Sequence, residues 1–130
     1  MLLAGAIGLG LAVDYVNEIG LANISAYEQE LLEYATRELK ANFPNLRIFG
    51  EAEHKTSVVS FLIGDIHPYD LGVILDKLGV AVRTGHHCTQ PIMQYFNIPG
   101  TLRASFAFYN TKSEIDQMIA ALQKGVAMLS

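Results

Sequence analysis

Apolar positions recur at helical spacing in some segments of the chain, and in others β-branched and aromatic residues cluster or alternate as in strands. Helices are predicted over residues 1–19, 23–43, 67–78 and 89–96 and from residue 110 or 111 onward. Strands are predicted over residues 46–49, 57–63, 80–83 and 101–108. This order predicts an α+β fold, in which helices cover a small antiparallel or mixed sheet.

Polar residues mark where two of these helices should begin. Asn23 or Ser25 is expected to cap the second helix, because Ser25 and Glu28 form the S-x-x-E capping pattern. Asn110 or Thr111 is expected to cap the last helix.

The N-terminal segment is apolar, with no charged side chain in residues 1–13. It is shorter than the roughly 20 residues that span a bilayer, and it lacks the basic start and cleavage site of a signal peptide. Glycines at positions 5, 8 and 10 weaken a helix by about 1 kcal/mol each. We therefore predict that residues 1–20 form an apolar helix that packs on another element.

Composition and charge limit the class of protein, the partners and the cellular compartment that suit this chain. A chain of 130 residues is one ordinary domain, and 51% hydrophobic residues exclude intrinsic disorder. The net charge of −4, from 9 basic and 13 acidic residues, gives no basic surface for nucleic acid. One cysteine excludes an intrachain disulfide and suits a reducing compartment.

Cys88 has two interpretations. A lone cysteine is most often a small buried hydrophobe. However, Cys88 ends a polar loop predicted over residues 84–88, with Arg83, His86 and His87 within five positions. A helix is predicted to begin directly after it, and positive charge and a helix N-terminus both favour the reactive thiolate.

Two other kinds of site are disfavoured here. His86, His87 and Cys88 are consecutive, so they do not easily turn three donors toward one metal ion, and His54 and His67 lie in separate segments. We therefore expect no metal. A Cys-His protease is also disfavoured, because the catalytic histidine is rarely adjacent in sequence. Either histidine can instead order the loop through hydrogen bonds.

Arg103 lies in a strand predicted to face a core, where a guanidinium needs an anion or a carboxylate. The alternative is a surface position with its head in water. Arg83 has the same two interpretations.

A longer pattern surrounds these residues. Residues 82–91 read V-R-T-G-H-H-C-T-Q-P, residues 98–105 read I-P-G-T-L-R-A-S, and residues 109–111 read Y-N-T. This resembles the R-x-G-H-H-C-x-x-P pattern of the SUF-type branch of pyridoxal-phosphate-dependent cysteine desulfurases and selenocysteine lyases, in the class V aminotransferase superfamily. The opening A-G-A-I-G-L-G-L-A-V-D-Y-V-N-E-I-G, residues 4–20, is similar to the helix that follows the large domain of that family. The resemblance therefore implies that residues 1–20 pack on a large domain missing from this sequence, and that residues 21–130 form the C-terminal small domain that carries the nucleophile loop.

The resemblance implies roles for the loop. Cys88 would be the nucleophile that takes sulfur from L-cysteine, leaving L-alanine and a persulfide. Arg103, with Arg83, would bind the substrate carboxylate, and the active-site loop would include Gly85, His86 and His87. It also implies a cytoplasmic homodimer that passes sulfur to an acceptor protein for iron–sulfur cluster assembly.

The chain resembles only the C-terminal part of that family. The cofactor-binding lysine segment is missing, and none of the chain's lysines, Lys40, Lys55, Lys77, Lys112 and Lys124, matches it. We therefore expect no cofactor-binding residue in this chain and negligible activity from it alone. The alternatives are a sulfur-carrier or interaction module without catalysis, and a parent enzyme that acts on selenocysteine.

Overall fold

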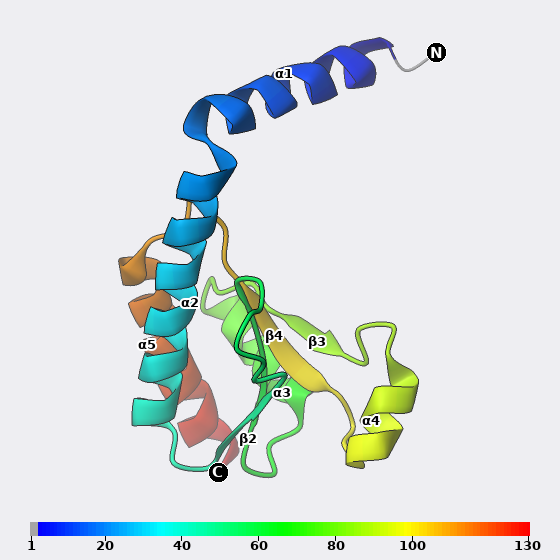
Figure 1. The fold of residues 1–130 in the computed structure, drawn as a ribbon. Helices are drawn as coiled ribbons and strands as arrows, with labels where there is room; N and C mark the ends of the chain where they lie inside the picture. The colour runs from blue at the N-terminus through cyan, green and yellow to red at the C-terminus, as the bar shows by residue number, and fades with distance from the viewer. Residues whose placement is uncertain (1–2) are drawn as a thin grey trace.

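A computed structural model describes residues 3–130 of the chain (Figure 1), which form five helices and four strands. The helices are α1 (Leu3–Ile19), α2 (Leu21–Asn42), α3 (Pro68–Lys77), α4 (Gln90–Phe96) and α5 (Lys112–Leu129). The strands are β1 (Leu46–Phe49), β2 (Val58–Ile63), β3 (Arg83–Gly85) and β4 (Thr101–Ser105). The element order is the one predicted from the sequence.

The strands form one antiparallel sheet in the order β1-β2-β4-β3. The two interior strands are therefore β2 and β4, and β3, with only three residues, lies at an edge. The α+β prediction is confirmed, and the sheet within residues 3–130 is wholly antiparallel.

The two faces of the sheet have different roles. Side chains alternate along a strand, and one set, which includes Val59, Phe61, Leu102 and Ala104, is buried in the core with α2, α3 and α5. The opposite face carries Val58, Ser60, Thr101 and Arg103, and these line a pocket under α4. Arg103 therefore does not point into the core; it lies on the pocket face of an interior strand.

Helix α1 stands apart from this core. It projects away from the rest of the fold (Figure 1), and none of its residues is buried. Leu3, Ile7, Leu9, Leu11 and Val13 are all exposed along it. Within residues 3–130 nothing covers these apolar side chains.

Three predicted boundaries were wrong. Helix α2 begins at Leu21 after Gly20, which has a φ of 91°, so neither Asn23 nor Ser25 caps it. Asn23 instead donates its side-chain amide to the Ile19 carbonyl, and this tightens the turn between α1 and α2. Strand β3 covers residues 83–85 rather than 80–83, and β4 ends at residue 105 rather than 108. The cap of α5 was predicted correctly: Thr111 and Glu114 form a capping box.

Candidate functional site

The loop after β3 is compact and held by local hydrogen bonds. Thr89 donates both its backbone N–H and its side-chain hydroxyl to the His86 carbonyl, at 2.9 and 2.7 Å. These bonds close a turn over residues 86–89, directly before α4, in which Pro91 occupies the first turn where no N–H is required. The His86 side chain itself is exposed.

The backbone requires glycine at two positions beside this loop, at the end of β3 and directly before β4. Gly85 has a φ of 107° and Gly100 a φ of 141°, values that favour glycine. A Cβ on Gly100 would lie 2.9 Å from the carbonyl carbon and oxygen of Gly85. The two backbones therefore lie in close contact where β3 ends and β4 begins, beside the loop.

Cys88 is exposed, so the interpretation as a buried hydrophobe is wrong. Its Sγ accepts a hydrogen bond from the Arg83 guanidinium, with Nη2 at 3.9 Å. The thiol therefore has a permanent positive charge beside it and solvent access, the two conditions that a nucleophilic or sulfur-accepting cysteine needs.

Arg103 and Arg83 lie directly opposite each other in the sheet. Arg103 pairs with Ser60 on one side and with Arg83 on the other, and cross-strand partners point to the same face. Within residues 3–130 neither guanidinium forms an ion pair with a carboxylate, and the buried Arg103 Nε has no hydrogen-bond partner. Two arginines paired across the sheet without a carboxylate partner among these residues are suited to bind an anion such as a carboxylate.

His87 points inward and contacts β4. Its Nε2 lies 2.9 Å from Thr101 Oγ1 and 3.2 Å from the Thr101 carbonyl oxygen. Burial lowers the pKa of His87 below its ordinary value; the bond to the Thr101 backbone opposes this, and the charges of Arg103, Arg83 and His86 add to it. The lowered pKa favours the neutral form of His87.

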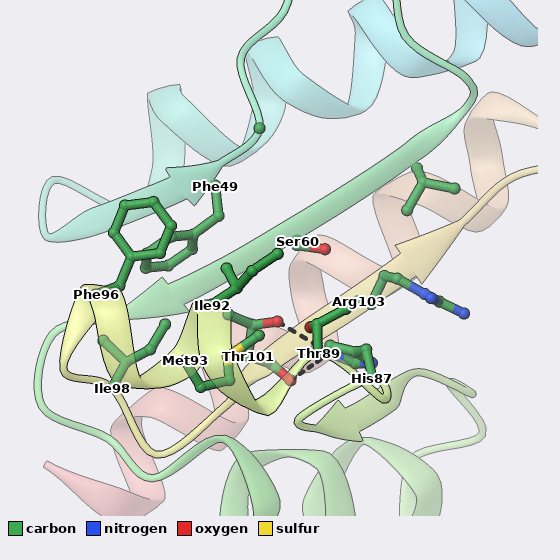
Figure 2. Close-up of a pocket in the computed structure, with 12 residues that line it drawn as sticks. Phe49, Ser60, His87, Thr89, Ile92, Met93, Phe96, Ile98, Thr101 and Arg103 are labelled. Carbon is green, nitrogen blue, oxygen red and sulfur yellow. Dashed lines mark hydrogen bonds between the residues drawn. The ribbon is translucent and has the colours of Figure 1, made fainter.

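A pocket of about 520 Å³ lies between α4 and the sheet. Figure 2 shows Phe49 and Phe96 at one end, with Arg103 and His87 toward the other. The remaining lining residues are Gly50, Val58, Ser60, Thr89, Ile92, Met93, Ile98 and Thr101. Its wall is thus apolar at one end and carries a guanidinium at the other. Cys88 follows His87 in the chain, but its exposed side chain does not line this wall.

The structure thus brings the predicted site residues into one region around β3, β4 and the 86–89 loop. Thr101, which contacts His87 and is 1% exposed, was not among the predicted site residues. One signal could have found it: Thr101 and Arg103 are two apart in a strand, so they share a face.

Residues 3–130 lack two further features. No group of three or more His, Cys, Asp and Glu side chains is arranged to hold a metal ion there. No helix in that range has the length and apolar character needed to cross a membrane.

The chain is similar to known proteins over most of its length. A family model described as aminotransferase class-V matches residues 2–118. A cysteine desulfurase of Serratia proteamaculans (strain 568) is 49% identical over 121 residues, or 93% of this chain. That match spans only 29% of the relative's length.

Two solved structures have the same fold. The crystal structure of the Escherichia coli cysteine desulfurase CsdA, in an S-sulfonic acid form, matches with a TM-score of 0.89 at 32% identity, covering 100% of this chain and 32% of that one. The apo structure of a cysteine desulfurase from Thermococcus onnurineus NA1 gives a TM-score of 0.88 at 35% identity, covering 96% and 31%.

Proposed function

This chain belongs to the aminotransferase class-V family, and from that premise we propose that it is the small domain of a pyridoxal-phosphate-dependent cysteine desulfurase. Cys88 is its sulfur acceptor and Arg103 its carboxylate-binding residue. The R-T-G-H-H-C sequence at residues 83–88 supports the SUF-type branch.

One observation carries this proposal. The chain's sole cysteine is exposed and hydrogen-bonded to Arg83, and Arg83 lies opposite Arg103 in the sheet. An amino-acid carboxylate bound to the Arg103 guanidinium at the pocket would give this cation the counter-ion that it lacks among residues 3–130. The rest of that amino acid can then lie within reach of the Cys88 thiol.

The net reaction balances with Cys88 as acceptor. L-Cysteine and the Cys88 thiol give L-alanine and a Cys88 persulfide. The carbon–sulfur bond of the substrate breaks, its sulfur joins Cys88, and the substrate's β-carbon keeps the electron pair and takes up a proton. The persulfide, on an exposed side chain, is then accessible to an acceptor protein that supplies sulfur for iron–sulfur clusters.

The cofactor does not fit this chain alone. Pyridoxal phosphate needs a lysine that forms an imine and protein groups that tune its ring, and no lysine or carboxylate lines the pocket within residues 3–130. Three of the lysines are engaged elsewhere: Lys40 with Glu51, Lys112 with Glu30, and Lys55 with the Gly50 carbonyl. The cofactor therefore belongs to a larger domain of the parent enzyme.

Helix α1 supports the same arrangement. Its exposed apolar side chains need a partner surface, and the matched relatives are about three times as long as this chain. Residues 1–20 are proposed to pack on the large domain, and residues 21–130 to form the small domain. The parent is proposed to be a cytoplasmic homodimer.

A domain graft tests the function. Residues 3–130 replace the matching segment of the Serratia relative, and L-alanine formed from L-cysteine is measured with pyridoxal phosphate present. The graft should be active, and Cys88→Ala should abolish desulfuration. Arg103→Gln should raise KM for L-cysteine at least about tenfold, because it removes a charged hydrogen-bonded contact. The 130-residue chain alone should form no alanine; full activity of the Cys88→Ala graft would refute the assignment.

The absence of a lysine from the described pocket favours one second function, a sulfur carrier that does no catalysis itself. A persulfide donor, with no cofactor present, would then leave a stable adduct of one sulfur atom on Cys88, detectable by mass spectrometry, while the graft would release no alanine.

If the parent instead acts on selenocysteine, Cys88→Ala would spare that activity.

A further inference from the structure

The backbone that carries Cys88 is strained. His87 and Cys88 have φ values of 54° and 63°, in the left-handed region that residues other than glycine rarely adopt. Each such residue costs on the order of 1 kcal/mol or more. Two in succession persist only where neighbouring contacts hold them.

One of these contacts joins His87 to Thr101. A carbonyl oxygen only accepts hydrogen bonds, so the 3.2 Å contact to the Thr101 carbonyl assigns the proton to His87 Nε2. The same N–H also points at Thr101 Oγ1, at 2.9 Å. His87 Nδ1 is then a bare nitrogen, buried and without a hydrogen-bond partner among the described residues.

Thr101 is held firmly in the fold by its burial and its place in the sheet. It is 1% exposed and begins β4, an interior strand, two residues before Arg103. A bond from His87 to Thr101 therefore fixes the residue next to Cys88 relative to the strand that carries Arg103.

We infer that His87 is a positioning residue, whose Nε2–H bond to Thr101 holds Cys88 in its left-handed conformation beside the Arg83 guanidinium. This deepens the proposed function and rests on it for the use made of Cys88. The His87–Thr101 contact itself is testable without cofactor or substrate.

The test compares three substitutions on the 130-residue chain. His87→Leu removes the donor, whereas His87→Gln keeps an amide N–H near the position of Nε2. Thr101→Val removes only the hydroxyl acceptor and leaves the carbonyl. His54→Leu, at an exposed histidine away from the site, is the matched control.

Because Cys88 is the only cysteine, selective ¹⁵N-cysteine labelling gives a single amide resonance. It should move or broaden in His87→Leu, shift less in Thr101→Val, and stay near its wild-type position in His87→Gln and His54→Leu. Nitrogen spectra of ¹⁵N-histidine should show the proton of His87 on Nε2. A proton on Nδ1, or an unchanged Cys88 resonance in His87→Leu, would overturn the inference.

A second readout measures the charge at the sulfur. The ratio of alkylation rates with iodoacetate and with iodoacetamide, relative to free glutathione, reports positive charge beside the thiol and cancels its general accessibility. One guanidinium at about 4 Å can favour the anionic reagent up to about fivefold. His87→Leu should lose most of this preference and His87→Gln should restore it; equal ratios in wild type and His87→Leu would contradict the inference. A graft that makes no alanine, with the ratios as expected, would refute only the proposed function.

Discussion

Replacing Gly100 with alanine should destabilise the fold more than any glycine substitution of similar backbone geometry that meets open space. The new Cβ would lie 2.9 Å from the Gly85 carbonyl carbon and oxygen and 3.0 Å from its Cα. All three are backbone atoms, so no side chain can rotate away to relieve the overlap. The strand ends beside the 86–89 loop would have to separate.

The expected loss of folding stability in Gly100→Ala has two parts. Forcing an extra methyl group into a filled space costs about 1–3 kcal/mol. Holding an alanine at a φ of 141° costs on the order of 1–2 kcal/mol more. Gly79 approximates the second part, because its φ is also positive, at 80°, and nothing lies within 4 Å of an added Cβ. Gly100→Ala should therefore be less stable than Gly79→Ala by about 1–3 kcal/mol.

Urea unfolding followed by circular dichroism measures this difference, since the chain has no tryptophan. With a slope of about 1–3 kcal/mol per molar urea for a small domain, the two midpoints should differ by about 1 M. Gly100→Ala should also lower the iodoacetate preference of Cys88, because Gly85 leads into its loop. Equal midpoints for the two variants would show that the backbones of Gly85 and Gly100 lie farther apart than the structure has them.

Three further results are expected. Thr111→Ala, which removes the acceptor for the Glu114 N–H in the α5 capping box, should cost about 1 kcal/mol in urea unfolding, while Thr111→Ser should cost little. Phe61→Ala should cost about 3–5 kcal/mol, because Phe61 is 0% exposed in the core; a smaller loss would mean that the core collapses around the cavity. Because burial lowers the pKa of His87 below 6.5, the unfolded chain binds the extra proton more readily. The stability due to neutral His87 is full above about pH 6.5 and is lost as pH falls toward the folded-state pKa. His87→Gln should therefore lose less stability than wild type between pH 7 and 5, and parallel pH curves for the two would contradict this.

The sequence was most informative where a local pattern decides the structure. The order of helices and strands and the Thr111 cap follow from spacing and end residues within a few positions of each other. Ser25 has an equally good capping pattern, yet α2 begins four residues before it. Gly20, with its positive φ, ends α1 and lets α2 begin at the next residue. A search for capping side chains does not detect such a turn of the backbone.

The candidate site was only partly predictable for a different reason. Arg83, His87, Cys88 and Arg103 stand out as polar or reactive residues in the sequence. Their grouping depends on the register that places Arg83 opposite Arg103, and on the hydrogen bond that ties His87 to Thr101. Register and long-range hydrogen bonds are decided by the packing of the whole sheet, so no local pattern gives them.

The short edge strand β3 has a kinetic consequence. Its three residues pair with β4 alone within the sheet, whereas Arg103 lies in a strand paired on both sides. Amides of such a short edge should exchange with solvent through local opening, at a far smaller free energy than global unfolding. In the proposed function, a sulfur carried on Cys88 would move outward when β3 frays, while Arg103, in a strand paired on both sides, stays in place.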